Sequence, residues 1–470
     1  MVNDPDLAFA SATELLARLR DRELASRELV ELYLERIARL DDRLGSYVEV
    51  TAERARAAAT EADERAAAGA ALPALHGLPV AIKDLNLWQG VRTTMGTRSL
   101  AGWIAPTDDT IVATLLAAGA IGLGKTNVPE LGTIGHTDTE LHGPCSTPWD
   151  LERNAGGSSG GAGAALAAGL CPLAQGSDGG GSIRIPAAVN GLVGLKPARD
   201  RVSSGPLFGE LSFGLSTGGA LTRTVADAAL SLDVVAGYST GDPGMAPPPS
   251  RSFLEEMRAP VGRLRIGVDR QAPLSPEGLH PSVAAALDRT VEVLEELGHE
   301  VQEVTLPVDP AISDQLRTLW AANLASQPVD ATMFEPVNAW LAEVGRQRSA
   351  ADAAAAQFAI QLTARGVVAA MDHLDAVVQP VVTGPSRPNG HYAGWDGEAV
   401  FADQTAWVGL TPLANLTGQP SISLPLHHDV EHGPVGVQFL GRPWDEAGLL
   451  RLAAQLEAAV PWRRVPPGFA

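Results

Sequence analysis

The sequence is poor in cysteine and in basic residues, and it contains no long apolar run. Its two cysteines, Cys145 and Cys171, cannot form a disulfide framework for 470 residues and indicate a reducing compartment. Lysine and arginine total 35 against 55 aspartate and glutamate, which gives a formal net charge of -20. A surface of this charge repels phosphate backbones and anionic lipids, and this argues against nucleic-acid and membrane partners.

No segment has the character of a targeting or membrane-spanning sequence. The most apolar window, residues 160–169, is shorter than the ~20 residues that a bilayer span needs. Residues 1–6 are acidic and do not lead into an apolar run, so no secretory signal is expected. We therefore expect a cytoplasmic protein.

The chain is 45% hydrophobic and 19% charged, which is typical of a soluble globular protein with room for a full core. Residues 11–69 predict helices, beginning at a capping box of Ser11 and Glu14. Beyond Leu78, short apolar runs alternate with helical patterns, which predicts a parallel or mixed sheet covered by helices. The strands expected there are residues 80–82, 120–123, 264–268, 376–378, 421–424 and 435–439, and the helices are residues 111–118, 225–236, 283–297 and 310–372.

Residues 119–126 fit the phosphate-loop pattern, ending in Lys125 and Thr126. A phosphate loop follows a strand and precedes a helix, whereas here residues 111–118 predict a helix and the interior of the motif predicts a strand. Nucleotide binding is therefore disfavoured, and Lys125 is interpreted as a structural residue at a strand end.

Gly157, Ser159 and Gly161 match the nucleophile elbow of a Ser-His-Asp hydrolase. The elbow should follow a buried strand, but residues 147–155 predict a polar loop. The downstream histidines that this alternative would need are His373, His391, His427, His428 and His432.

His427, His428 and His432, with the carboxylates among them, also offer metal-ligand residue types within a short stretch. They lie between two strand-like runs, which favours a solvated hairpin over a metal site. No metal and no cofactor are expected.

A fourth set of residues has a chemical logic of its own. Ser182 follows three glycines, which allow successive N–H groups to line up toward an oxyanion. A nearby base is needed, and Lys83, at the end of a strand that its apolar residues predict to be buried, can serve if burial keeps it neutral. Ser158, in a Gly/Ser run, could pass a proton between them because a hydroxyl both donates and accepts.

These residues resemble the amidase signature family, whose members carry a Ser-cisSer-Lys triad. The likeness extends over nearly the whole chain. It includes the motifs at residues 124–130, 143–149, 194–197, 201–203, 221–227, 415–420 and 434–438.

The resemblance implies Ser182 as the nucleophile, Ser158 as a bridging serine after a cis peptide, and Lys83 as the base. It also implies an oxyanion hole formed by the backbone N–H groups of Gly179, Gly180, Gly181 and Ser182. Asp178 and Arg184 are expected to brace this loop rather than react.

The sequence departs from the family pattern at several positions without losing a member of the triad. Gly179 stands where a residue with a side chain is common, which adds conformational freedom to the oxyanion loop. The other departures are Thr147, Ala155, Ala198 and Asp200.

The resemblance implies a single α/β domain over residues 1–470, with one large mixed sheet between helical layers. Residues 1–70 would be helices packed outside, residues 71–235 the signature core, and residues 306–410 the segment that shapes the substrate pocket. Aromatic side chains that could line an acyl channel are Trp320, Phe334, Trp340, Trp395, Phe401 and Trp407.

The expected activity is hydrolysis of a small-molecule amide by a stand-alone enzyme, resembling members that cleave 6-aminohexanoate oligomers. Carbamates (urethanes) and esters stay open as substrates, and so does a homodimer. The alternatives are a glutamine-hydrolysing amidotransferase subunit, the hydrolase based on Ser159, and a non-catalytic binding protein on an amidase scaffold.

Overall fold

The computed structural model describes residues 5–470. Residues 1–4, which carry part of the argument against a secretory signal, lie outside the described residues. Within the described part of the chain, no helix combines the length and apolar character needed to cross a membrane.

An eleven-stranded mixed sheet runs through the molecule in the order β1-β3-β2-β8-β10-β9-β14-β15-β13-β11-β12. Its strands are β1 Tyr47–Val50, β2 Pro79–Lys83, β3 Ile121–Thr126, β8 Ala174–Asp178, β9 Val193–Lys196, β10 Thr217–Thr222, β11 Arg265–Val268, β12 Glu300–Glu303, β13 Ala376–Pro380, β14 Ser421–Asp429 and β15 Gly433–Gly441. Two small two-stranded sheets pair β4 Asp138–Thr139 with β5 Gly143–Pro144, and β6 Ser146–Thr147 with β7 Asp150–Asn154.

The α-helices fill the intervals between the strands. They are α1 Pro5–Ala8, α2 Ala12–Arg20, α3 Ser26–Leu40, α4 Ala52–Ala67, α5 Thr110–Ala117, α6 Gly160–Ala167, α7 Arg184–Asn190, α8 Val225–Val235, α9 Phe253–Glu256, α10 Pro281–Glu296, α11 Ile312–Ala325, α12 Pro336–Arg346, α13 Ala350–Ala370, α14 Gly397–Val408, α15 Leu413–Thr417 and α16 Glu446–Ala459.

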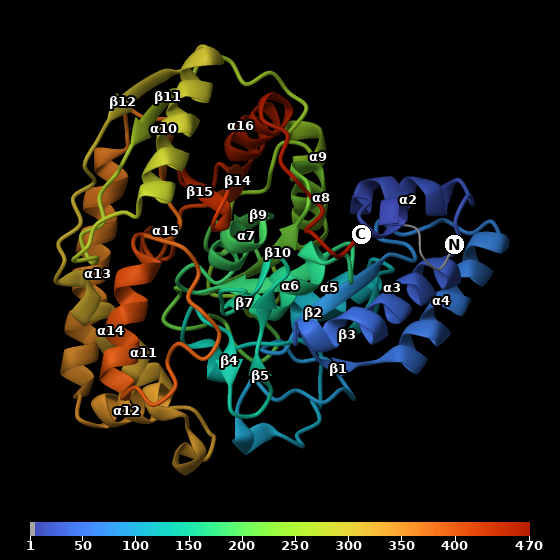
Figure 1. Ribbon diagram of the computed structural model, residues 1–470, viewed down its shortest axis with the longest axis horizontal. Coiled ribbons are helices and arrows are strands. Elements are labelled where there is room, and N and C mark those ends of the chain that lie inside the picture. Colours follow the sequence, from blue (N-terminus) through green and yellow to red (C-terminus); the bar gives the residue numbers. More distant parts are fainter. Residues whose placement is uncertain (1–4) are drawn as a thin grey trace.

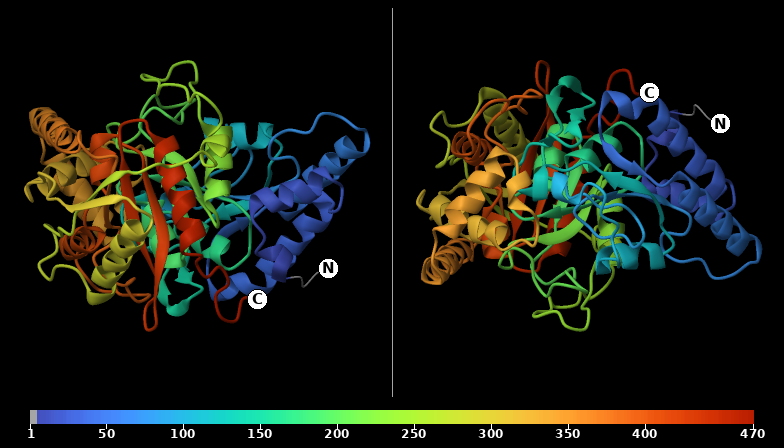
Figure 2. Two further views of the ribbon diagram at one scale, coloured as in Figure 1. Left: turned by 90° about the horizontal axis from the view of Figure 1, so that it is seen from above. Right: turned by 90° about the horizontal axis from the view of Figure 1, so that it is seen from below.

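The sheet lies between helical layers, as expected. A Cβ added at Gly436 of β15 would meet Ala188 of α7, whereas one at Gly441 would meet Leu449 of α16. Side chains alternate along a strand, so α7 and α16 cover opposite faces of the sheet. Helices α2, α3 and α4 lie at one end of the molecule and α11–α14 at the other (Figure 1), and the views at right angles show the same separation (Figure 2).

The predicted elements are present with small shifts of their ends, but two predictions need correction. Residues 11–69 are not entirely helical, because Tyr47–Val50 forms the edge strand β1, antiparallel to β3. The carboxylate of Asp41 directs the chain into this strand by accepting hydrogen bonds from the N–H groups of Ser46 and Tyr47. Residues 147–155 contain strand β7 rather than only a polar loop, although β7 is not part of the large sheet.

Candidate active site

The site forms where two parallel strands end at the same edge of the sheet. β2 and β8 pair in parallel, so Lys83, the last residue of β2, lies near Asp178, the last residue of β8. The glycine run of residues 179–181 follows β8 directly, and α7 begins two residues after Ser182. The sheet thereby brings together the lysine and the serine that the sequence singled out.

Lys83 is fully buried and is surrounded by oxygen atoms. Its Nζ donates to Ser158 Oγ at 2.8 Å, to Ser177 Oγ at 3.1 Å and to the Ser177 carbonyl at 3.2 Å. Burial lowers the pKa of Lys83 to about 7, although the Asp178 carboxylate acts in the opposite direction. No role for Ser177 was predicted from the sequence, and its contact with Lys83 is a finding of the structure.

Ser158 reaches Lys83 from a tightly packed glycine segment. The Gly157–Ser158 peptide bond is cis, and Gly156 has a φ of 74°. A Cβ on Gly157 would lie 3.0 Å from the backbone of Gly135 and of His136, so a side chain has no room there. The glycines before Ser158 thus let two stretches of backbone pass in contact and hold the hydroxyl toward the lysine.

Ser182 lies next to this segment, and its carbonyl accepts the N–H of Ser159 at 3.1 Å. Among residues 172–190, partial exposure is confined to Ser177, Gly179, Gly180 and Ser182, which mark the opening of the site. Within residues 5–470, the Ser182 hydroxyl and the N–H groups of Gly179, Gly180 and Ser182 have no protein hydrogen-bond partner. These groups are therefore available to a bound substrate.

Gly181 differs from its neighbours, because its N–H donates to Asp178 Oδ1 at 2.8 Å. An N–H that already donates to a carboxylate is not free for a substrate oxygen. This removes Gly181 from the expected set of oxyanion donors and leaves Gly179, Gly180 and Ser182. Gly181 still has a conformational role, since its φ of 124° is one that side chains disfavour.

Asp178 and Arg184 brace the loop, in agreement with the expectation from the sequence. The Arg184 Nη2 and Nε atoms lie 2.8 and 3.0 Å from the two Asp178 oxygens, and both side chains are fully buried. Burial alone would raise the pKa of Asp178, but the charges of Arg184 and Lys196, together with the hydrogen bonds from Arg184 and Asn415, outweigh it and hold that pKa well below its usual range. Asn415 and Gln438, from the C-terminal motifs, accept the remaining Arg184 hydrogen bonds at 2.8 and 2.7 Å.

Lys125 lies beside the site and has a structural environment, as interpreted from the sequence. It belongs to β3, and its buried Nζ is 3.0 Å from Asp84 Oδ1, in the geometry of an ion pair. The same Nζ donates to the Asn86 carbonyl at 2.7 Å and to Thr93 Oγ1 at 2.9 Å. No loop remains in residues 121–126 for a phosphate to occupy.

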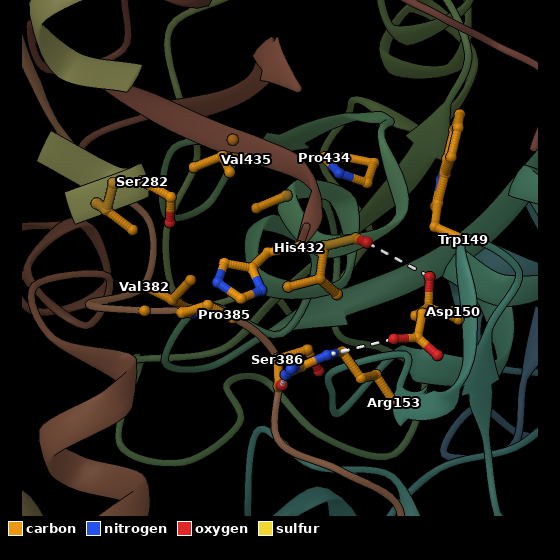
Figure 3. Close-up of a pocket in the computed structure, with 16 residues that line it drawn as sticks. Trp149, Asp150, Arg153, Ser282, Val382, Pro385, Ser386, His432, Pro434 and Val435 are labelled. Carbon is orange, nitrogen blue, oxygen red and sulfur yellow. Dashed lines mark hydrogen bonds and ion pairs between the residues drawn. The ribbon is translucent and has the colours of Figure 1, made fainter. Parts of the chain in front are cut away.

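The histidine-dependent alternatives find no support in this geometry. The buried Ser159 hydroxyl donates to the Ser177 carbonyl at 3.3 Å, and it makes no hydrogen bond with a histidine among residues 5–470. His427 and His428 belong to β14 and His432 lies just before β15, so the three histidines lie on the expected hairpin. Figure 3 shows that His432 points into a separate pocket beside Pro385 and Arg153.

The six aromatic side chains proposed for an acyl channel divide into two groups. Trp320 approaches the glycine run, because a Cβ on Gly180 would lie 3.1 Å from Trp320 Cη2. The other five side chains pack elsewhere. Phe334, Trp340 and Phe401 form a cluster between α11, α12 and α14. Trp407 is buried against α7, and Trp395 lies against His391 and Tyr392.

Comparisons with known proteins show the family to which the chain belongs. The family model described as Amidase matches residues 28–450. The amidase-family protein AmiB2 of Mycobacterium tuberculosis is 40% identical, with 99% of each chain covered. A glutamyl-tRNA(Gln) amidotransferase subunit of Thioalkalivibrio sulfidiphilus is 37% identical, with 97% of this chain and 98% of that chain covered.

Among solved structures, 6-aminohexanoate cyclic dimer hydrolase complexed with substrate superposes with a TM-score of 0.91 at 30% identity. The match covers 98% of this chain and 99% of that one. The chain belongs to the amidase family and is an amide-hydrolysing enzyme.

Proposed function

We propose that this protein is a stand-alone amidase that forms an acyl-enzyme on Ser182, with Ser158 as the proton relay and Lys83 as the base. The observation that carries the proposal is the hydrogen bond of 2.8 Å between the fully buried Lys83 amine and the Ser158 hydroxyl, in the segment that lies next to the partly exposed Ser182. A lysine without a counter-ion in contact can lose its proton near neutral pH and then accept one from a serine.

In the first half of the reaction, Ser182 Oγ attacks the substrate carbonyl carbon and its proton moves to Ser158. Ser158 passes its own proton to neutral Lys83, so the relay ends with an ammonium and an unchanged serine. The hydrogen bond from Ser182 to Ser158 is expected to form with substrate, since catalytic hydrogen bonds are often longer in the free enzyme. The N–H groups of Gly179, Gly180 and Ser182 then stabilise the oxyanion.

In the second half, the tetrahedral adduct collapses and its C–N bond breaks. The Lys83 proton returns through Ser158 to the leaving amine, which departs neutral and leaves an ester on Ser182. Water attacks that ester and gives one proton to the same relay. When this second adduct collapses, its bond to Ser182 Oγ breaks, the relay returns the proton to Ser182, and the carboxylic acid is released with Lys83 neutral again.

A small-molecule amide is the proposed substrate, and carbamates present the same carbonyl to the same nucleophile. The structural likeness to 6-aminohexanoate cyclic dimer hydrolase supports an amide of an aliphatic acid. The likeness to an amidotransferase component supports glutamine as a second candidate, although a net charge of -20 disfavours docking to tRNA. Assays with glutamine and with aliphatic amides, side by side, separate these two candidate substrates.

Two further expectations stay predictions. One is a single domain over residues 1–470, and the other is a homodimer, which light scattering can test.

The test of the triad uses a fluorophosphonate that labels activated serines, followed by peptide mapping. We expect labelling of Ser182 in the wild type and in Ser159→Ala, and loss of labelling in Lys83→Ala. A label on Ser159, or no label on folded wild-type protein, would contradict the proposal. Ser159→Ala is the matched control because Ser159 is adjacent to Ser158, but its hydroxyl donates to the Ser177 carbonyl and makes no hydrogen bond with Lys83.

A further inference from the structure

The glycine run is in contact with one aromatic side chain of the helical segment. A Cβ on Gly180 would lie 3.1 and 3.2 Å from Trp320 Cη2 and Cζ2 and 3.9 Å from Pro412 Cγ. The edge of the indole therefore lies within about 5 Å of the Gly180 Cα. Gly179 has no such neighbour, since a Cβ there would meet only Ser216, at 3.6 Å.

The position of Trp320 is fixed by the packing of α11. Leu316 and Leu319 on this helix are buried, and Trp320 is half-buried against the same core cluster. On the other side, a Cβ on Gly345 of α12 would collide with the carbonyl oxygen of Ala321, so the two helix backbones touch beside Trp320. These contacts fix the helix that carries Trp320, and they give the indole a defined position beside Gly180.

The contact matters because Gly180 is one of the N–H groups open to a substrate oxygen. A carbonyl oxygen held by that N–H places the carbonyl carbon, and the first atom of the acyl group, beside Gly180. The acyl side of the site is then limited by the indole edge, while the Ser216 side offers a small polar neighbour. Between the indole edge and Ser216, an unbranched α-carbon requires less width than a branched one.

We propose that Trp320 is a specificity-determining residue that admits acyl groups with an unbranched α-carbon and an apolar chain lying along the indole, and that rejects α-branched acyl groups. This inference rests on the proposed function, because it assumes that Ser182 attacks the carbonyl. The closeness of Trp320 also gives a reason for glycine at position 180, since a Cβ there would lie 3.1 Å from Trp320 Cη2.

The test compares labelling rates of Ser182 by two fluorophosphonates, one with a linear alkyl group on phosphorus and one with a branched group of equal carbon number. We expect the wild type to prefer the linear probe by at least about tenfold. In Trp320→Ala the preference should fall by about tenfold, mainly because the branched probe reacts faster. Trp320→Phe should lie between them, and it stays informative if Trp320→Ala fails to fold.

The control is Trp395→Ala, which removes an aromatic side chain that lies against His391 and Tyr392. It should keep the wild-type preference. On aliphatic amides, Trp320→Ala should raise KM for linear acyl groups by more than it lowers kcat. Equal changes for both probes in Trp320→Ala would overturn the role of Trp320, whereas folded wild type that neither probe labels at Ser182 would overturn the proposed function itself.

Discussion

Two buried lysines on neighbouring parallel strands have opposite surroundings. Lys83 on β2 donates to the hydroxyls of Ser158 and Ser177, and no carboxylate among residues 5–470 contacts it. Lys125 on β3, beside Ile82 in the register, pairs with the Asp84 carboxylate at 3.0 Å. Both amines are inaccessible to solvent, so the difference lies in their partners.

The comparison shows how one residue type serves chemistry in one place and stability in another. Burial lowers the pKa of both amines, and at Lys125 the Asp84 carboxylate opposes it by charge and by hydrogen bonding. The carboxylate that acts on Lys83 is Asp178, which is already engaged by Arg184. A lysine whose counter-ion is shared with an arginine can release its proton, whereas one with its own carboxylate is favoured as an ammonium.

The largest expected effect is the loss of activity in Lys83→Met. Without the base, kcat/KM for an amide should fall by about 10³-fold or more while far-UV circular dichroism stays unchanged. Lys83→Arg should be equally inactive, because a guanidinium cannot become neutral near pH 7. Wild-type turnover in either variant would show that Lys83 is not the base.

Lys125→Met should instead lower the free energy of unfolding, by about 3–5 kcal/mol, because it leaves the Asp84 carboxylate buried without its partner. Urea denaturation measures this change. The double variant Asp84→Asn with Lys125→Met should recover part of the loss, since the unpaired charge is gone. If Lys125→Met is as stable as the wild type, Lys125 does not stabilise the fold and the contrast with Lys83 is wrong.

The pH dependence of kcat/KM should follow the neutral fraction of Lys83. Protonated Lys83 cannot accept the serine proton, so activity is expected to fall by about tenfold per pH unit below the pKa of about 7 and to level off above it. Lys196 is a necessary control, because burial, assisted by the Arg184 charge, also lowers its pKa to about 7. The fall of kcat/KM at acidic pH should persist in Lys196→Met. If it disappears in that variant, the titrating group is Lys196 and not Lys83.

The smallest expected effect is that of Ser177→Ala. The variant removes one oxygen that stabilises the Lys83 ammonium, so the apparent pKa in the pH profile should shift downward by about one unit or less. Activity at pH 8 should stay within about threefold of wild type. A loss as large as that of Lys83→Met would instead give Ser177 a direct part in proton transfer.

Much of the fold was predictable because its causes are local. The capping box of Ser11 and Glu14 starts α2, and the apolar runs of β2, β3, β11 and β13–β15 mark strands in a readable way. Strand β8 carries small and polar residues, so it has little intrinsic strand preference. It exists because β2 and β10 supply its hydrogen-bond partners.

The division between local and tertiary causes holds within the site as well. The sequence alone determined the set of candidates, because a glycine run before Ser182, a Gly/Ser run around Ser158 and a lysine at a strand end each carry a local chemical signature. Only the tertiary structure decided that Ser177 is a second partner of Lys83, that Asp178 takes the N–H of Gly181, and that Trp320 faces Gly180. The contacts of Lys83 join residues 75 and 94 positions apart, and that of Trp320 spans a still greater separation. Their existence depends on the order of strands in the sheet and on the packing of α11, and no local pattern encodes either.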